Sequence, residues 1–305
     1  MKYIFLNYLC FENSSYMKKI IIILMASFLL VQCKKDDVKQ TNNTGGSILK
    51  DTILLNVTYG THSRNIMDIH LPEKRDSTTP VLLFLHGGAW KAGDKSELNV
   101  YVNALKKEWP GLAIANMNYR YANNDSNIHH PQMMADIKNA IGFLINNKQN
   151  YQVGSNMAIS GGSAGGQLAM IYAYAYNDYN NIKCVANIFG PALIRDWSWY
   201  SSNNIWLGGN VGEILAEYVG QTWDSAAYAQ VSPLDRVNTN TPPTIIFHGN
   251  LDPIVPIYQS QWLNAELGKK GVAKEFHEYI AFHSFDATQR TDVVKKMTAF
   301  FKKHL

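Results

Sequence analysis

The chain has 305 residues, 46% of them hydrophobic and 17% charged, with a formal net charge of +4. This composition can bury a sizeable core, which excludes a disordered chain, and the lysines and arginines are too scattered for a nucleic-acid-binding stripe, so we expect no nucleic-acid partner. The three cysteines and nine histidines show no metal-ligand spacing, so we expect no metal and no cofactor.

The first 33 residues have the pattern of an export signal. Lys18 and Lys19 precede the apolar run 20–31, which fits a secretory signal and is shorter than the ~20 residues of a membrane-spanning helix. The segment 30–33 resembles a bacterial lipobox. This resemblance implies lipidation of Cys33 and an exported, membrane-anchored lipoprotein that faces the periplasm or the cell surface. A signal without a lipid, and secretion of the protein, is the alternative.

Two further features bound this region. Met17 begins a more typical signal, so residues 1–16 are either translated or an upstream start that is never used. Residues 34–50 are polar and of low complexity, which predicts a flexible tether. The folded domain is expected over residues 51–305.

From residue 51 onward, strand-like and helix-like runs alternate. The runs 53–59 and 64–71 have the period-two pattern of strands and flank a turn, which predicts a hairpin. The apolar runs that predict strands buried on both faces are 81–85, 112–117, 157–160, 185–189 and 244–247. The expected helices are 96–109, 132–146, 164–176, 258–269 and 286–302. This alternation predicts an α/β fold, with a mostly parallel central sheet covered by helices on both faces and the hairpin as its antiparallel edge.

One segment, 191–240, interrupts the alternation. It is rich in tryptophan and tyrosine and contains no strand-like run. We interpret it as a cap-like insertion over the C-terminal edge of the sheet, where ligands bind in open α/β sheets. Its aromatic side chains have two possible roles, packing within the cap or stacking against sugars and phenolic groups.

The segment 157–166 carries the strongest chemical motif. A short apolar strand runs into Gly-Gly-Ser-Ala-Gly at 161–165, which is G-x-S-x-G, and a helix follows. This strand–turn–helix context is typical of the nucleophile elbow of α/β-hydrolases. Neither a P-loop, which needs Gly-Lys-Ser/Thr, nor a G-x-G-x-x-G dinucleotide loop fits these residues. Ser163 is therefore the predicted nucleophile.

A second glycine-containing loop, 86–90, follows the predicted strand 81–85. In the α/β-hydrolase fold, one donor of the oxyanion hole comes from this loop and another from the residue after the nucleophile. The predicted donors are therefore the backbone N–H groups of Gly88 or Ala89, together with that of Ala164.

Three motifs together resemble those of a known family. His-Gly-Gly-x-Trp at 86–90, Asn-Tyr-Arg at 118–120 and the elbow resemble the esterase/lipase branch related to hormone-sensitive lipase, of the BD-FAE carboxylesterase type. The resemblance covers about residues 52–305 and implies an α/β-hydrolase fold. It also implies that His86 orders the oxyanion loop. Ala89 stands where the lipase motif has a third glycine, and its N–H group is retained.

The same resemblance supplies the acid and the base. His-Gly-x-x-Asp-x-x-Val-Pro at 248–256 resembles the acid loop of the family and implies that Asp252 is the acid. His283, shortly before the last predicted helix, matches the position of the base, and the order serine, acid, histidine is that of the fold. His283 is expected to take the Ser163 hydroxyl proton, and Asp252 to hold the imidazole in the required tautomer.

The other candidate acids and bases receive structural interpretations. Asp286, three residues after His283, is the rival acid and is expected to cap the last helix. His248 is interpreted as structural, and His129 and His130 as surface or cap residues. Three further histidines lie in strand-like or turn segments without an evident partner: His62, His70 and His277.

A Ser-His-Asp triad predicts acyl transfer to water, and three hypotheses follow from it. The first is a serine carboxylesterase for small acyl esters, such as acetyl or feruloyl groups on carbohydrate. The second is a prolyl-oligopeptidase-like serine peptidase, against which the esterase-like loop at 86–90 argues. The third is a non-catalytic binding protein, against which the presence of all three triad residues argues. The sequence does not indicate the oligomeric state.

Overall fold

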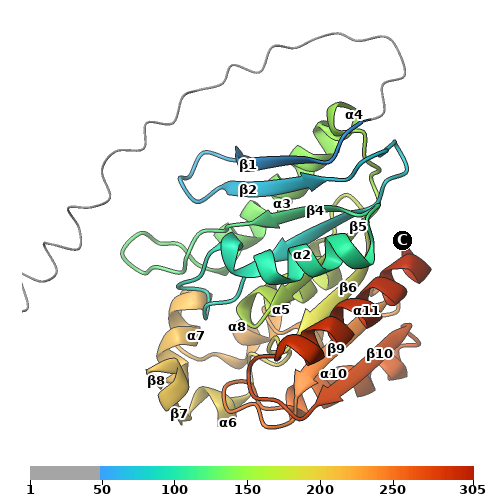
Figure 1. Cartoon of the computed structure of the whole chain (residues 1–305). Coiled ribbons are helices and arrows are strands. Elements are labelled where there is room, and N and C mark those ends of the chain that lie inside the picture. Colours follow the sequence, from blue (N-terminus) through green and yellow to red (C-terminus); the bar gives the residue numbers. More distant parts are fainter. Residues whose placement is uncertain (1–48) are drawn as a thin grey trace, which may run out of the picture. The chain divides into compact units, whose positions relative to one another are not determined.

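The computed structural model describes residues 49–305 (Figure 1). The predicted signal, the predicted lipidation site Cys33 and nearly all of the predicted tether lie outside the described residues. Export and lipidation therefore stay predictions from the sequence. Within residues 49–305, none of the helices combines the length and the apolar character needed to cross a membrane.

An eight-stranded sheet forms the centre of the fold, in the order β1-β2-β4-β3-β5-β6-β9-β10 (Figure 1). Its strands are β1 (Thr52–Thr58), β2 (Ile66–Leu71), β3 (Val81–Leu85), β4 (Ala113–Met117), β5 (Met157–Gly162), β6 (Ile182–Ile188), β9 (Thr244–Gly249) and β10 (Lys274–Tyr279). The pairs β1–β2 and β2–β4 are antiparallel, and the remaining neighbours in this sheet are parallel. The predicted α/β fold with a mostly parallel sheet and an antiparallel edge hairpin is confirmed.

The edge strand β10 is the strand that the apolar runs did not delimit. Its sequence, Lys-Glu-Phe-His-Glu-Tyr, is largely polar and none of its residues is buried, because the strand has a neighbour on one side only. The central strands β3 and β9 are buried at every position. Continuous apolar runs therefore identify the central strands, but they do not identify the edge strand β10.

Helices cover both faces of the sheet. On one face lie α2 (Asn99–Glu108) and α11 (Ala287–His304), and on the other α3 (His130–Asn146), α5 (Ala164–Ile171) and α10 (Tyr258–Lys269) (Figure 1). The alternation of side chains along β3 divides the core in the same way, since Leu82 and Phe84 face the first pair and Leu83 and Leu85 face the second group. A π-helical turn, Tyr172–Tyr176, follows α5, so the predicted helix 164–176 is not α-helical throughout.

The segment 191–240 contributes no strand to the central sheet. Its elements are α6 (Trp197–Tyr200), β7 (Asn203–Asn204), a 3-10 turn (Ile205–Leu207), β8 (Gly209–Asn210), α7 (Val211–Val219), α8 (Ser225–Gln230) and α9 (Pro233–Arg236). Elsewhere, a 3-10 helix (Lys95–Leu98) precedes α2, and α4 (Lys148–Tyr151) follows α3. Tyr218, Tyr228 and Trp199 are buried, whereas Trp197 is 56% exposed. Packing therefore accounts for these three aromatic side chains, while Trp197 keeps a ring open to solvent.

Candidate active site

Ser163 lies in the turn between β5 and α5, with a φ of 54° and a ψ of −123°. A positive φ is strained for a residue with a side chain and often marks a functional position. The turn is possible because glycines flank it. A Cβ on Gly161 would lie 2.2 Å from the carbonyl carbon of Gly165, and a Cβ on Gly165 would lie 2.4 Å from the carbonyl oxygens of Leu85 and His86. Glycine at both positions therefore lets β5, α5 and the oxyanion loop meet at the serine.

The structure brings Ser163, Asp252 and His283 together. The Nε2 atom of His283 lies 2.8 Å from Ser163 Oγ, and its Nδ1 atom lies 2.6 Å from Asp252 Oδ2. Asp252 comes from the loop after β9, and His283 from the loop between β10 and α11. Because a carboxylate can only accept, Nδ1 carries the proton of the neutral ring, and Nε2 is free to accept the serine proton. This is the hydrogen-bond order that a nucleophile, a base and an orienting acid require.

The loops that carry Asp252 and His283 are tied to each other. The N–H group of Leu251 donates to the carbonyl oxygen of Ala281 at 3.0 Å. A Cβ on Gly249 would lie 2.3 Å from that same oxygen. Because residue 249 is a glycine, the two loops can approach closely enough for Asp252 and His283 to form a hydrogen bond.

The Asp252 carboxylate is fully buried, and both of its oxygens are occupied. Oδ1 accepts from the N–H groups of Ile254 (2.8 Å) and Val255 (3.0 Å), and Oδ2 lies 2.6 Å from His283 Nδ1 and 3.2 Å from His248 Nε2. Burial alone would raise the pKa of Asp252, but the hydrogen bonds from His248 and His283 outweigh it and hold that pKa well below its ordinary value. The carboxylate therefore stays ionised throughout the neutral pH range.

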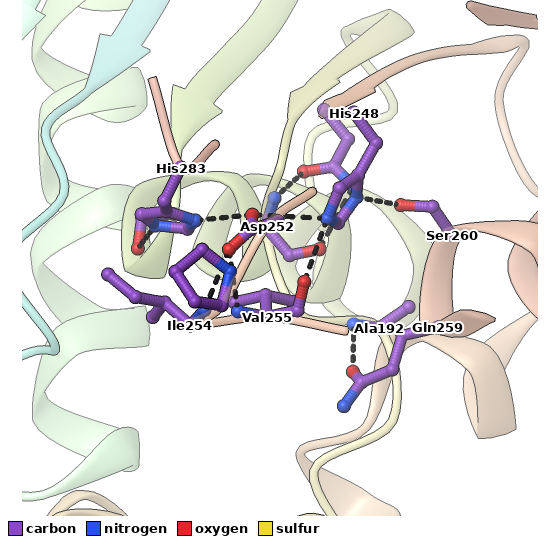
Figure 2. Close-up of polar contacts among 12 residues, drawn as sticks. Ala192, His248, Asp252, Ile254, Val255, Gln259, Ser260 and His283 are labelled. Atoms are coloured by element: carbon purple, nitrogen blue, oxygen red, sulfur yellow. Dashed lines mark hydrogen bonds and ion pairs between the residues drawn. The ribbon is translucent and has the colours of Figure 1, made fainter. Parts of the chain in front are cut away.

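His248 is the residue of this site whose contacts the sequence did not predict (Figure 2). It belongs to β9 and is fully buried. Its Nε2 atom lies 3.0 Å from the carbonyl oxygen of Val255 as well as 3.2 Å from Asp252 Oδ2, and its Nδ1 atom lies 2.6 Å from Ser260 Oγ. The available signal was its place four residues before the acid in the His-Gly-x-x-Asp motif.

The oxyanion loop has a positive φ at three consecutive residues, 109° at Gly88, 49° at Ala89 and 62° at Trp90. Glycine is required at position 88, where a Cβ would lie 2.1 Å from a backbone carbonyl oxygen. Ala89 and Ala164 line the same cavity as Ser163, whereas Gly88 lies outside its lining. Among the described residues, nothing accepts a hydrogen bond from the N–H groups of Ala89 and Ala164. Of the two predicted donors in this loop, the structure therefore favours Ala89.

His86 and Arg64 hold the oxyanion loop from behind. His86 Nδ1 lies 2.7 Å from the carbonyl oxygen of Gly87, and its Nε2 lies 3.2 Å from Arg64 Nη2. Because arginine can only donate, Nε2 accepts and Nδ1 carries the proton. Burial lowers the pKa of His86 to about 4, which keeps the ring neutral. The ring also stacks on Tyr119 at a centroid distance of 4.4 Å, so these contacts fit the loop-ordering role that the resemblance implies.

A cavity of about 310 Å³, including its open mouth, adjoins Ser163. The oxyanion loop, the elbow, the segment 191–240 and the acid loop all contribute to its lining, which consists of Ala89, Trp90, Ser163, Ala164, Pro191, Trp199, Leu207, Val211, Ile214, Leu215, Ile254 and Val255. The two indole N–H groups are already engaged, since Trp90 donates to Gln167 and Trp199 to the Ile254 carbonyl. Ser163 is therefore the one side chain of this lining with a polar group free for a ligand.

A buried chain of hydrogen bonds connects the cavity wall to three helices. Gln167 Oε1 on α5 accepts from Trp90 Nε1 (2.9 Å) and from the Tyr218 hydroxyl on α7 (3.0 Å). The Tyr218 oxygen in turn accepts from His130 Nδ1 on α3 (2.7 Å), and His130 Nε2 accepts from the Tyr176 hydroxyl (3.1 Å). Burial lowers the pKa of His130 to about 4. The expectation that His130 is a surface residue is wrong, because its ring fills the centre of this chain.

The remaining acids and bases lie away from the serine. Asp286 caps α11 by accepting from a backbone N–H group at 2.8 Å, and His129 is the N-cap residue of α3, so both predicted cap roles are confirmed. His277 pairs with Glu275 at 3.1 Å, and His62 accepts from a backbone N–H group of its own turn, so the expectation that they lack partners is wrong. Within residues 49–305, no group of histidines, cysteines and carboxylates is arranged to hold a metal ion.

A serine on a strand–turn–helix elbow, bonded to a late histidine at the edge of a sheet with this strand order, defines a protein of the α/β-hydrolase fold. A family model described as BD-FAE matches residues 67–267, which include the oxyanion loop, the elbow and Asp252. The chain belongs to the BD-FAE family.

The chain is similar to Esterase LipC of Mycobacterium tuberculosis (strain ATCC 25618 / H37Rv), with 26% identity over 67% of this chain and 52% of that protein. Among solved structures it is similar to a bifunctional GH43-CE protein of Bacteroides eggerthii, with a TM-score of 0.71 and 23% identity over 84% of this chain and 38% of that one. It is also similar to a truncated carbohydrate esterase from gut microbiota, with a TM-score of 0.69 and 20% identity over 83% and 97% of the two chains. At these identities the structural likeness shows the fold alone. The chain spans 52% to 61% of the length of the curated relatives that it matches first.

Proposed function

We propose that this protein is a serine carboxylic ester hydrolase that removes small acyl groups, acetyl above all, from carbohydrate esters. The observation that carries the proposal is the hydrogen-bond chain from Ser163 through His283 to Asp252, which opens onto a cavity with two free backbone donors. The esterase name of LipC and the carbohydrate esterase among the structural neighbours support it.

In the first half of the reaction, Ser163 Oγ attacks the carbonyl carbon of the ester while His283 Nε2 takes the hydroxyl proton. The carbonyl oxygen becomes an oxyanion, to which the N–H groups of Ala89 and Ala164 donate. The intermediate then collapses, the bond to the alcohol oxygen breaks, and His283 returns the proton to that oxygen. An acyl group remains on Ser163. Asp252 stabilises the imidazolium during the transfer and remains ionised.

In the second half, water attacks the acyl carbon and His283 takes a proton from it. The same two donors stabilise the new oxyanion. Its collapse breaks the bond to Ser163 Oγ, which recovers the proton from His283, and the carboxylic acid leaves. Water is the only co-substrate that these two half-reactions consume, and no cofactor takes part in them.

The character of the cavity supports a short, apolar acyl group. Its lining offers no free polar side chain apart from Ser163. The phenolic hydroxyl of a feruloyl group would lose its water there without gaining a partner, at a cost of ~1–3 kcal/mol. We therefore propose acetyl rather than feruloyl esters as the substrate class.

The test is hydrolysis of p-nitrophenyl acetate and of acetylated xylo-oligosaccharides, compared with a feruloyl ester and a prolyl p-nitroanilide. We expect turnover of both acetyl esters, at least ~10-fold slower turnover of the feruloyl ester, and a loss of ~10³-fold or more in Ser163→Ala. Cleavage of the prolyl substrate alone would support a peptidase. Retained polysaccharide binding without turnover of any substrate would support a non-catalytic binding protein.

We also propose that the enzyme is exported and anchored to a membrane by a lipid on Cys33. The proposal depends on the apolar run 20–31 and the lipobox-like residues 30–33. Metabolic labelling with a fatty-acid analogue tests it. Label on the wild-type protein but not on Cys33→Ala is the expected result, and equal labelling of both would contradict the anchor.

A further inference from the structure

Asp252 lies between two histidines (Figure 2). His283 is on one side of the carboxylate and His248 on the other, and Ser260 lies beyond His248. His248 on β9 and Ser260 on α10 are buried, and the side chain of Asp252 is fully buried as well. The acid therefore contacts a second, enclosed imidazole that does not reach Ser163.

The hydrogen-bond partners determine which nitrogen of His248 carries its proton. Nε2 faces the Val255 carbonyl oxygen at 3.0 Å and Asp252 Oδ2 at 3.2 Å, and both of these oxygens can only accept. Nε2 is therefore protonated and its N–H group is shared between them. In the neutral ring Nδ1 must then accept, and the Ser260 hydroxyl, 2.6 Å away, donates to it. One tautomer satisfies every contact of this histidine.

We propose that His248 is a positioning residue for Asp252, whose shared Nε2–H group, fixed by the Ser260 hydroxyl, keeps Oδ2 turned toward His283. Two backbone N–H groups already hold Oδ1, so His248 supplies the second point that stops the carboxylate from rotating about its Cβ–Cγ bond. This inference rests on the proposed hydrolase function, because the orientation of Asp252 affects catalysis only if His283 acts as the base.

Both histidines donate to Oδ2 of Asp252. Within the described residues, they are the titratable side chains in contact with this carboxylate. Without His248, His283 would be the one described side chain that holds Oδ2, while the two backbone N–H groups would still hold Oδ1. The hydrogen bond between His283 and Asp252 therefore reports on the contact with His248.

Two substitutions at position 248 separate the contact from mere packing. In His248→Asn the amide takes the place of Nδ1 and keeps the Ser260 contact but cannot reach Asp252. In His248→Gln the amide nitrogen takes the place of Nε2 and can still donate to Asp252. The matched control is His277→Asn on β10, a histidine paired with Glu275. The assays are kcat and KM for p-nitrophenyl acetate, thermal unfolding, and the NMR chemical shift of the His283 Nδ1–H proton, which reports on its hydrogen bond to Asp252.

For His248→Asn we expect kcat to fall ~10- to 100-fold, the factor for one hydrogen bond to a charged group, with KM nearly unchanged. The NMR signal of the His283 Nδ1–H proton should shift, because the carboxylate that accepts from it is no longer held in place. His248→Gln should restore most of kcat and return this signal toward wild type, and His277→Asn should keep the wild-type kcat and signal. An unchanged kcat in His248→Asn, or a loss that glutamine does not restore, would overturn the inference while leaving the hydrolase proposal intact. A wild-type protein without esterase activity would defeat the hydrolase proposal, and an unshifted His283 signal in His248→Asn would then still decide against the contact.

Discussion

Replacing Tyr218 by phenylalanine removes one of the polar groups that join α7 of the segment 191–240 to the rest of the fold, the others being on Glu217. Tyr218 is fully buried, its hydroxyl donates to Gln167 at 3.0 Å, and it accepts from His130 Nδ1 at 2.7 Å. The substitution leaves a buried N–H group of His130 without a partner, which costs ~1–3 kcal/mol. The ring and its stack on Trp90, at a centroid distance of 4.4 Å, remain. We expect the free energy of unfolding to fall by that amount, with a decrease in Tm of roughly 2–4 °C for each kcal/mol.

Tyr172→Phe is the matched control for this experiment. Tyr172 is 1% exposed, and its hydroxyl has no hydrogen-bond partner within the part of the chain that the structure describes. Its removal leaves no orphaned group, so the free energy of unfolding should change by less than ~0.5 kcal/mol. Urea unfolding at neutral pH, followed by circular dichroism and tryptophan fluorescence, measures both variants. Equal losses in the two variants, or no loss in Tyr218→Phe, would refute the role assigned to the hydrogen-bond chain.

Three further predictions follow from the site. Asp252→Asn should lower kcat for p-nitrophenyl acetate by ~10³- to 10⁴-fold through the wrong imidazole tautomer, whereas Asp286→Ala should keep kcat and lose ~0.5–2 kcal/mol of stability as a helix cap; comparable kcat losses would contradict the assignment. His86 and His130 are neutral in the fold with pKa values of about 4, so the unfolded state binds protons first as the pH falls. The free energy of unfolding, measured by urea titration, should therefore decrease as the pH is lowered from about 6.5 to about 4, by at most ~1.4 kcal/mol per pH unit for each histidine; a flat profile would exclude this linkage. Leu215→Ala should deepen the cavity and shift activity toward longer p-nitrophenyl acyl esters, with a stability loss of ~2–5 kcal/mol; an unchanged chain-length profile would argue against Leu215 as a wall of the acyl site.

The parts of the site that could be predicted are those written in short stretches of sequence. Steric contacts within a few residues require glycine at positions 161 and 88, where a Cβ would meet the backbone of Gly165 and of Ala92. Such requirements appear in the sequence as short glycine motifs, and the position of Ser163 can be predicted from one of them. The central strands were predictable for a similar reason, because burial on both faces demands continuous apolar runs.

The parts that could not be predicted depend on contacts between distant segments. Gln167 on α5 meets Trp90 and Tyr218, which stand 77 and 51 residues away in the chain. Each of these residues satisfies a buried polar group of another, and none carries a local signal of that role. The burial of His130 could not be predicted for the same reason. Its position at the start of a helix suggests exposure, but its hydrogen-bond partners lie on other elements.

The described fold separates the groups proposed for the chemistry from those proposed for acyl selection. The groups proposed for the chemistry lie on loops that follow β3, β5, β9 and β10, and the sheet and the bonds between the acid and base loops hold them. Much of the cavity wall comes instead from residues of 191–240, such as Val211 and Leu215. Hydrogen bonds of Tyr218, of the Trp199 indole and of the Glu217 carbonyl are among those that join this segment to the rest of the fold. Substitutions on the cavity side of α7 can therefore change the shape of the acyl site without moving Ser163 or His283.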